Sequence, residues 1–309
     1  MVNESLRCTR LAALAWTLAL AAACTAGSSS NPAPFPAPGP TPPSSSAGQE
    51  VLVGAGDIAW CGLDGGALTA SLLDQIQGTV FTTGDHAYPL GTLADFQRCY
   101  EATWGRHKAR TRPVPGNHDY GDGTTDGADY FTYFGPNAGP PGLGYYSYQL
   151  GAWHIVALDS EISAFPGSPQ MTWLRADLAA NSSQCTLAIF HTPVFGSGTN
   201  GSNPHMQVAW RSLYDSGVDV VVNGHNHSYE RFAPQNPDGG FDPARGIREF
   251  VVGTGGAQLT GFPRIQANSE VRSSTWGVLK LTLSADRYDW EFVSVAGQSF
   301  SDSGGASCH

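Results

Sequence analysis

The sequence predicts an α/β domain. Short apolar strands alternate with helical segments over its first half, and a polar motif directly follows each strand. This alternation is typical of sheets with parallel strands, in which functional turns gather at the carboxyl ends of the strands. The last third of the chain adds strands in which apolar and polar residues alternate, as in antiparallel sheet.

The chain begins with a predicted signal peptide, residues 1–23. Arg7 and Arg10 precede an apolar run over residues 11–23 that is too short to span a bilayer comfortably. The run ends in Leu20-Ala21-Ala22-Ala23-Cys24, which resembles a bacterial lipoprotein box. We expect Cys24 to carry a lipid; the alternative is ordinary cleavage after Ala23 or Ala26, with Cys24 incidental.

Residues 24–48 predict a flexible tether, because they are rich in proline and serine and almost free of apolar side chains. Residues 49–309, roughly 260 in number, can bury a core of their own. We expect an exported protein, either a cell-surface lipoprotein or a periplasmic or extracellular one. It would touch a membrane only through a lipid on Cys24.

The charge of the chain excludes some partners. The formal net charge is −10 at pH 7. An acidic surface disfavours non-specific binding to nucleic acid and to anionic lipid, so we expect neither. No pattern in the sequence indicates an oligomeric state.

Four cysteines of the folded part form an even set, and export implies an oxidising compartment: Cys61, Cys99, Cys185 and Cys308. Their spacing does not resemble a zinc knuckle, so we expect disulfides. Four cysteines allow three pairings. We favour Cys61–Cys99 with Cys185–Cys308, although the sequence does not choose among the three.

Periodicity and turn residues place the expected elements. In the first half they are strands at 50–53 and 79–82, helices at 63–77 and 92–103, and a short extended segment at 112–115. Residues 121–144 predict a long irregular loop. A hairpin (145–150 and 153–158), a helix (169–180), a strand (186–190), a helix (205–214) and a strand near 219–222 follow, and closing strands are expected near 247–252, 276–283 and 287–295.

Five strand ends deliver residues that can bind metals: Asp57, Asp85 with Tyr88, Asn117 with His118, His191, and His225 with His227. This mixture of oxygen and imidazole ligands suits transition metals, and the ligands are too many for one ion. One carboxylate can bridge two ions. The pattern therefore predicts a binuclear metal site.

The segments around these residues are Gly56-Asp57, GDHAY at 84–88, GNHD at 116–119, FHTPVF at 190–195 and GHNHSYER at 224–231. In this order they resemble the calcineurin-like metallophosphoesterases, over about residues 50–231. The resemblance implies a four-layer sandwich of two mixed β-sheets flanked by helices. It also makes residues 49–309 a metallophosphoesterase catalytic domain.

Tyr88 indicates the branch. Most members of the superfamily carry a histidine two residues after the first aspartate, where this chain has Ala59. The purple acid phosphatases instead use a tyrosine three residues after the bridging aspartate, which is the place of Tyr88. Ionising a phenol at low pH needs a strong Lewis acid, so the ferric ion of that branch makes chemical sense.

The resemblance implies two metal sites that share Asp85. An Fe(III) site would use Asp57, Asp85, Tyr88 and His227. A second site, for divalent Fe, Zn or Mn, would use Asp85, Asn117, His191 and His225. His118 is implied as a substrate-contacting catalytic residue, and His205 is the nearest candidate for a further one.

Other residues have more ordinary expected roles. We expect His86 to hydrogen-bond its own loop and Asp119 to anchor its turn or a nearby histidine. His205 could equally be an ordinary residue at the start of a helix.

The resulting hypothesis is an exported phosphatase of acid phosphatase type that hydrolyses small phosphate monoesters by attack of metal-bound hydroxide. One alternative is a phosphodiesterase or nucleotide-cleaving enzyme on the same scaffold. Another is a surface binding protein without catalysis, which would have lost ligands. The loops at 121–144 and 196–204 are expected to roof the site and to decide between monoesters and diesters.

Overall fold

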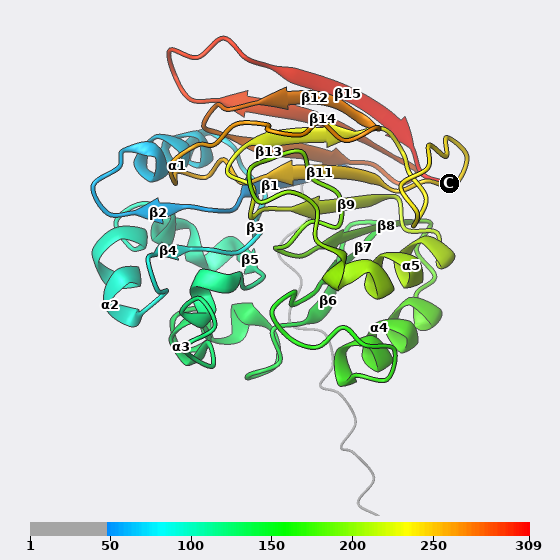
Figure 1. Cartoon of the computed structure of the whole chain (residues 1–309), viewed down its shortest axis with the longest axis horizontal. Helices are drawn as coiled ribbons and strands as arrows, with labels where there is room; N and C mark the ends of the chain where they lie inside the picture. Colours follow the sequence, from blue (N-terminus) through cyan, green and yellow to red (C-terminus); the bar gives the residue numbers. More distant parts are fainter. Residues whose placement is uncertain (1–47) are drawn as a thin grey trace, which may run out of the picture. The chain divides into compact units, whose positions relative to one another are not determined.

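The computed structural model describes residues 48–309. The predicted signal peptide, Cys24 and residues 25–47 of the predicted tether lie outside this range. Within it, two large β-sheets and their helices form the architecture (Figure 1). The predicted α/β fold with two mixed sheets flanked by helices is confirmed.

The first sheet has six strands, in the order β15 (Asp302–Ser307), β14 (Arg287–Ser294), β13 (Gly277–Leu283), β1 (Glu50–Ala55), β3 (Thr79–Thr82) and β5 (Thr111–Pro113). Strands β1, β3 and β5 are parallel, and β13 pairs antiparallel with β1. Strands β13, β14 and β15 form an antiparallel meander. Burial alternates from Leu279 to Leu283 in β13, as expected from its sequence.

The second sheet has seven strands, in the order β12 (Ser269–Ser273), β10 (Tyr229–Phe232), β11 (Arg248–Val252), β9 (Val220–Asn223), β8 (Cys185–Ile189), β7 (Trp153–Ala157) and β6 (Tyr146–Leu150). The predicted hairpin is β6–β7. Strand β11 was expected to be antiparallel, but it pairs parallel with β9 and antiparallel only with β10. Its continuous burial from Glu249 to Val252 fits a central strand.

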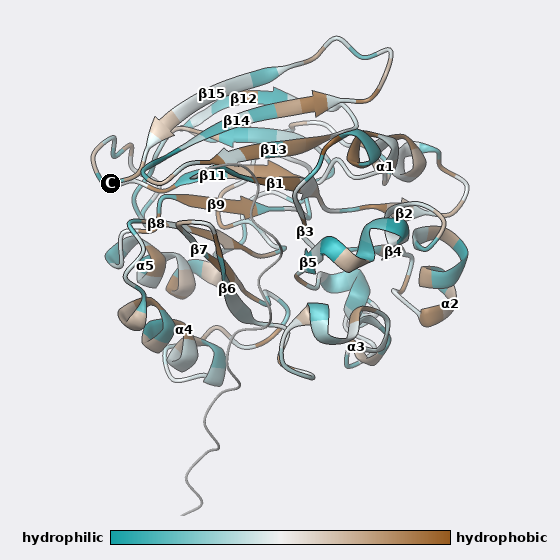
Figure 2. Ribbon diagram, turned by 180° about the vertical axis from the view of Figure 1, so that it is seen from behind, coloured by the Kyte–Doolittle hydropathy of each residue, from teal (hydrophilic) through white to brown (hydrophobic). Residues whose placement is uncertain are grey.

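Helices cover the outer faces of the two sheets. Helix α1 (Gly65–Gln75) lies beside the six-stranded sheet, whereas α4 (Pro169–Ala180) and α5 (Gln207–Asp215) cover the seven-stranded one (Figure 1). Strand β8 shows why both faces of its sheet are buried. Leu187 and Ile189 point into the core between the sheets, while Ala188 packs in the core under α4 and α5. Figure 2 shows the apolar character of the central strands β1, β9 and β13.

The helical segment expected at 92–103 changes its winding. It begins as α2 (Leu93–Asp95), continues as a π-helix (Phe96–Tyr100), and is followed by a 3₁₀-helix (Trp104–Arg110). Shorter 3₁₀ turns lie at Asn117–Tyr120 and Pro204–Met206. Thr92 and Asp95 form a capping box at the start of α2, which fixes where the helix begins.

The prediction of an irregular loop at 121–144 was wrong. This stretch contains helix α3 (Ala128–Phe134) and a 3₁₀ turn (Gly135–Ala138). Tyr130, Tyr133 and Phe134 lie on one face of α3 and are buried. Tyr133 and Phe134 pack against the aromatic side chains of Phe96 and Tyr100, and Tyr130 packs against Phe134. Burial of these rings stabilises α3, whereas the glycines on both sides of it led to the prediction of a loop.

Both favoured disulfides are present: Cys61–Cys99 and Cys185–Cys308. The second ties β15 to the start of β8. Among residues 48–309, no helix has the length and apolar character needed to cross a membrane.

Candidate metal centre

The side chains that the sequence singled out follow neighbouring strands. Asp57, Asp85 and Asn117 come after the parallel strands β1, β3 and β5. His191 and His225 come after the parallel strands β8 and β9 of the other sheet. Because parallel strands end at the same edge of their sheet, each sheet contributes its set of side chains at one edge. The structure brings the two sets into contact.

The first group of side chains surrounds the phenol of Tyr88. Its hydroxyl oxygen lies 3.1 Å from Asp57 Oδ1, 3.2 Å from Asp85 Oδ2 and 3.1 Å from His227 Nε2. His227 Nε2 also lies 3.2 Å from Asp57 Oδ1. Atoms that share one ion at about 2.1 Å each are expected to lie about 3 Å from one another. The Tyr88 hydroxyl therefore has three candidate ligand atoms at this spacing, from Asp57, Asp85 and His227.

The second group surrounds Nε2 of His191. This nitrogen lies 3.3 Å from Asp85 Oδ2, 3.1 Å from Asn117 Oδ1 and 3.2 Å from His225 Nδ1. His225 Nδ1 is also 3.1 Å from Asn117 Oδ1. Asp85, His191 and His225 form a cluster whose ligand atoms all lie within 4.8 Å of one another.

Asp85 joins the two groups through a single atom. Its Oδ2 faces both the Tyr88 hydroxyl and His191 Nε2. Its other oxygen, Oδ1, accepts a 2.8 Å hydrogen bond from the backbone N–H of His118, which fixes the carboxylate plane. Asp85 therefore contacts both groups of candidate ligands.

Three of these residues have a left-handed backbone, with φ of 57° at Asp57, 53° at Asp85 and 67° at His225. Such conformations cost on the order of 1 kcal/mol or more for residues other than glycine and persist only where the surroundings enforce them. Asp57 Oδ2 accepts the backbone N–H of His225 at 2.9 Å, which links two of the three. Strain gathered at one place in this way is typical of functional sites.

Neighbouring groups orient the ligand atoms. His191 Nδ1 donates to the carbonyl of Thr83 at 2.6 Å, and His227 Nδ1 donates to the carbonyl of Gln258 at 2.9 Å, so both imidazoles turn Nε2 inward. The Asn117 amide donates to Asp122 Oδ1 at 3.1 Å, which turns its oxygen inward. Such outer hydrogen bonds fix the tautomer and direction of metal ligands.

The charges at the centre indicate that a cation belongs between these atoms. The carboxylate of Asp85, the oxygen of Asn117 and a ring nitrogen of His225 all converge on His191 Nε2. Burial opposes the charge of Asp85, but His191 and His118 outweigh it and hold the Asp85 pKa below its usual range. Burial, together with the charges of Asp57 and Asp85, raises the pKa of Tyr88 well above 10. The donor set therefore fits metal ions, with a proton in their place when none is bound.

Two residues outside the centre behave as expected. His86 is fully buried, and its ring contacts Asp119 Oδ2 at 2.9 Å and Thr82 Oγ1 at 2.6 Å. Asp119 also accepts the backbone N–H groups of Asp85 and Gly116, each at 2.9 Å. Together they hold the turns that carry Asp85 and Asn117.

The two proposed catalytic histidines differ in position. His118 Nδ1 donates to the Pro89 carbonyl at 2.5 Å, and its Nε2 lies 4.0 Å from Asp85 Oδ2. Its side chain is 26% exposed, so solvent and a substrate can reach it. His205 instead contacts the Ile162 carbonyl through Nε2 at 3.1 Å. No hydrogen bond or ion pair within residues 48–309 joins it to the clustered ligands, and its catalytic role stays a prediction.

Asn226, which the sequence pattern does not single out, lies between the two histidines of the GHNH motif and is fully buried. Its side chain accepts the N–H of Asn200 at 2.8 Å and donates to the Gly201 carbonyl at 3.1 Å. Asn200 in turn donates to the His225 carbonyl at 2.6 Å. The loop at 196–204 is thereby fastened to the second ligand group. The G-H-x-H spacing drew attention to the histidines and not to the residue between them.

The chain is similar to calcineurin-like phosphoesterases and to purple acid phosphatases. The model of the calcineurin-like phosphoesterase family matches residues 47–229. Purple acid phosphatase 18 of Arabidopsis thaliana is 35% identical over 120 residues, which are 36% of this chain and 26% of that protein. Purple acid phosphatase 21 of the same plant is 35% identical over 144 residues, 43% and 32% of the two chains. Uncharacterized protein Rv2577 of Mycobacterium tuberculosis is 26% identical over 249 residues, 62% and 47% of the two chains.

Solved structures share the fold. Purple acid phosphatase PPD1 from yellow lupin (Lupinus luteus) seeds superposes with a TM-score of 0.71 at 22% identity, covering 88% of this chain and 55% of that one. GAP50, the anchor in the inner membrane complex of Plasmodium, has a TM-score of 0.65 at 16% identity, covering 85% and 90%. The two Arabidopsis phosphatases match over only 26% and 32% of their own length.

Proposed function

Because the chain belongs to the calcineurin-like phosphoesterase family, we propose that it is a metal-dependent hydrolase of small phosphate monoesters, of the purple acid phosphatase type. One observation carries the proposal: Asp85 Oδ2 faces the Tyr88 hydroxyl in one ligand group and His191 Nε2 in the other. A tyrosine in this place distinguishes a phosphatase of that branch from other members of the family.

Two metal ions are proposed, with Asp85 shared between them. Asp57, Tyr88 and His227 would complete an Fe(III) site, and Asn117, His191 and His225 would complete a site for divalent Fe, Zn or Mn. When bound, the ions would supply the Lewis acidity that activates water and neutralises charge on the phosphate. The chain itself positions the candidate ligand atoms in two ways. The turns at Asp57, Asp85 and His225 have a left-handed backbone, and backbone carbonyls orient the rings of His191 and His227.

His118 is the proposed proton donor for the leaving alcohol. Its Nδ1 is occupied by the Pro89 carbonyl, so Nε2 is the nitrogen that can transfer a proton. That nitrogen lies beside Asp85 on a side chain partly open to solvent. A positioned acid of this kind contributes about 10²–10⁴-fold to the rate.

We predict that His118→Gln lowers kcat/KM for an alkyl phosphate by about 100-fold, because an alkoxide needs a proton to leave. The loss for 4-nitrophenyl phosphate should stay under about 10-fold, because nitrophenolate leaves without one. Initial rates on the two esters measure the difference. His107→Gln, which alters a ring contacting Asp74 and Arg110, is the control. Equal losses on both esters would show that His118 is not the acid.

The pH dependence of metal uptake follows from the two inward-facing imidazoles. Burial disfavours their charge, but Asp85 outweighs this and raises the His191 pKa to about 10, and Asp57 similarly raises the His227 pKa to about 9. Both pKa values lie above the ordinary histidine value of 6.5. At pH 7 each ring of the metal-free protein is therefore protonated on Nε2 as well as on Nδ1, and a metal ion must displace the proton on Nε2. In the metal-free protein these two positive charges stabilise the folded state. Their contribution to the free energy of unfolding is fully present below pH 6.5 and is lost as the pH rises through 9 to 10.

Metal binding at pH 7 should therefore release protons, and metal affinity should rise with pH through 9 to 10, as the two rings lose their protons. Calorimetric titration with Zn²⁺ in two buffers of different ionisation enthalpy measures the protons released. If the heat of Zn²⁺ binding were the same in both buffers, no protons would be released, and the protonation proposed for His191 and His227 would be wrong.

Substrate size is the next proposed property. The loop at 196–204 is held against the second ligand group by Asn200 and Asn226, which favours small monoesters over bulky diesters. His205 is retained only as a predicted residue at the mouth of the site. We also propose export, with a lipid on Cys24, in an oxidising compartment; the two disulfides support that compartment.

The proposal is tested by hydrolysis of matched aryl phosphate mono- and diesters across pH, with Asp85→Ala as the blank. Preference for the monoester with an acidic optimum is expected. Preference for the diester would favour a phosphodiesterase or nucleotide-cleaving enzyme. Turnover of neither ester by protein that has bound two metals would overturn the proposed general phosphatase activity.

A further inference from the structure

The ring of Tyr88 contacts the rings of Trp60, His118 and His227. Trp60 stacks on one side, with ring centroids 4.9 Å apart and an interplanar angle of 17°. His118 lies 4.5 Å away at an angle of 51°. Tyr88 itself is 1% exposed, whereas Trp60 is 42% exposed. The side chain that covers a proposed metal ligand is therefore a surface residue, which something else has to hold in place.

The backbone next to Trp60 runs alongside the backbone of Tyr88. Strands β2 (Ala59–Trp60) and β4 (Ala87–Tyr88) pair in parallel, with Trp60 opposite Tyr88. In the part of the chain from 48 to 309, this two-stranded sheet is separate from both large sheets. It therefore lacks the support that neighbouring strands give to β1 or β9.

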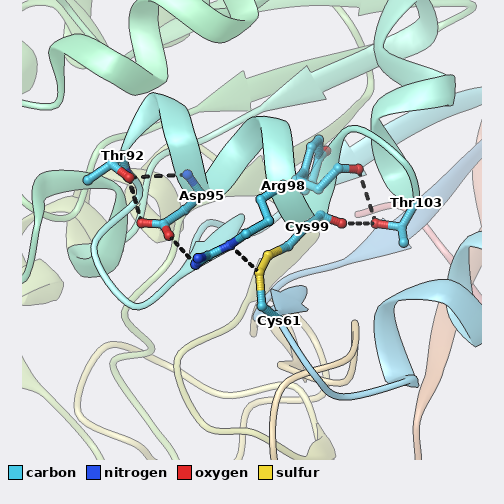
Figure 3. The surroundings of a disulfide bond; sticks show 7 residues. Cys61, Thr92, Asp95, Arg98, Cys99 and Thr103 are labelled. Carbon is cyan, nitrogen blue, oxygen red and sulfur yellow. Dashed lines mark hydrogen bonds and ion pairs between the residues drawn. A yellow bond between two sulfur atoms is a disulfide. The ribbon is translucent and has the colours of Figure 1, made fainter.

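A cluster around the Cys61–Cys99 disulfide supplies that support (Figure 3). Cys61 directly follows Trp60, and the disulfide ties it to the π-helix at Phe96–Tyr100. The Arg98 guanidinium donates from Nε to Cys61 Sγ at 3.0 Å and from Nη2 to Asp95 Oδ1 at 3.0 Å.

The far end of this cluster is also held. Asp95 lies in the capping box with Thr92, and its carboxylate accepts the Thr92 hydroxyl at 2.7 Å. Thr103 donates its hydroxyl to the Cys99 carbonyl at 3.0 Å (Figure 3). The loop that carries Trp60 is thus fastened to a capped helix rather than left to solvent.

We propose that Trp60 and the Cys61–Cys99 disulfide form a brace that positions the Tyr88 phenol for metal binding. The proposal rests on Tyr88 being a metal ligand, which is part of the proposed function. With the disulfide intact, the stacked ring keeps the Tyr88 hydroxyl between Asp57, Asp85 and His227. Without the disulfide, Trp60 can move away from the Tyr88 ring. The Tyr88 side chain then gains conformational freedom, and metal binding has to remove it at a cost in affinity.

The second disulfide provides a matched control. We would compare the Cys61→Ser/Cys99→Ser variant with the Cys185→Ser/Cys308→Ser variant. Fe(III) is delivered as its nitrilotriacetate complex, and the readouts are affinity by chelator competition and the visible phenolate-to-iron absorption. Serine variants are preferable to a reductant, because a reductant would also reduce Fe(III).

Loss of the brace should lower Fe(III) affinity by at least about 10-fold and shift the absorption band, as loss of groups that orient ligands does. The control variant should keep the affinity within about twofold. Its disulfide spans 123 residues rather than 38, so its loss should lower the melting temperature more. If Fe(III) affinity fell in both variants in proportion to the loss of melting temperature, the effect would be one of general stability, and the brace would be ruled out.

Single substitutions test the ring itself, even if a cysteine variant fails to fold. Trp60→Ala should reproduce the affinity loss and band shift, and Trp60→Phe should restore most of both. Phe241→Ala removes another exposed ring, 62% exposed, in the connection from β10 to β11. It should change neither readout. Equal behaviour of Trp60→Ala and wild type would overturn the proposal.

Failure of the brace and failure of the proposed function give different results. Wild type that binds Fe(III) with a phenolate band but hydrolyses no phosphate ester contradicts the function alone, and the variants then still decide the brace. Wild type without a phenolate band shows that Tyr88 is no ligand, and both proposals fall.

Discussion

Replacing Asp85 by alanine is expected to abolish hydrolysis, lowering kcat/KM by at least about 1,000-fold. The same Oδ2 faces the Tyr88 hydroxyl and His191 Nε2, so one substitution removes a ligand from both proposed metal sites. It also removes the carboxylate oxygen that lies 3.3 Å from His191 Nε2. Metal content should fall from two ions per chain to less than one. Steady-state rates and elemental analysis of the same preparation measure both effects.

Asp219→Ala is the matched control for that experiment. Asp219 is also a buried carboxylate, and it accepts the backbone N–H of Thr186 at 2.9 Å at the start of β8, the end of that strand opposite His191. Its loss should destabilise the fold without removing metal. An Asp85→Ala protein that kept two ions and turned over substrate would refute the bridging role.

Replacing Tyr88 by phenylalanine should remove all visible colour from the iron-loaded protein, because only a phenolate supplies that charge transfer. The hydroxyl contributes three contacts of 3.1 to 3.2 Å at the centre, whereas the ring's stacking on Trp60 is kept. Fe(III) affinity should fall by at least about 100-fold, since a ligand and its negative charge are lost. Absorption spectroscopy and chelator competition provide the readouts.

Tyr130→Phe controls for the loss of a buried phenol elsewhere. Tyr130 is fully buried, and its hydroxyl donates to the Pro113 carbonyl at 3.1 Å. The colour should survive this change. Colour that survived Tyr88→Phe instead would exclude Tyr88 as its source and with it the tyrosinate assignment.

The grouping of candidate ligands could be predicted from sequence because of where they stand in the chain. A short strand ends within four residues before each of the candidate ligands Asp57, Asp85, Asn117, His191 and His225. Parallel strands bring such residues to one edge whatever the loops between them do. Their metal-binding roles remain predictions, but this feature of α/β sheets accounts for the grouping within each sheet, whereas the meeting of the two sets depends on how the sheets pack.

What orients these ligands could not be predicted. The carbonyls of Thr83 and Gln258, which fix the His191 and His227 rings, belong to the backbone and leave no mark on residue type. The role proposed for Trp60 could not be predicted either, for a different reason. Its contact with Tyr88 depends on a two-residue strand pair, which is too short to give a periodic signal.

Helix α3 shows how local composition can mislead. Tyr130, Tyr133 and Phe134 have the i, i+3, i+4 spacing of a helix face, but glycines on both sides suggested a loop. Packing against Phe96 and Tyr100 stabilises the helix, and those residues lie some thirty positions earlier in the chain. A signal that depends on distant partners is weak in any short window of sequence.

The most direct test of a binuclear phosphatase is to add metal back to metal-free protein while measuring hydrolysis of 4-nitrophenyl phosphate. Iron is added first and zinc second, and bound ions are counted in each sample. We predict that activity appears with the second ion and levels off at two ions per chain. Full activity with one ion, or activity that persists in excess chelator, would contradict the two-metal account.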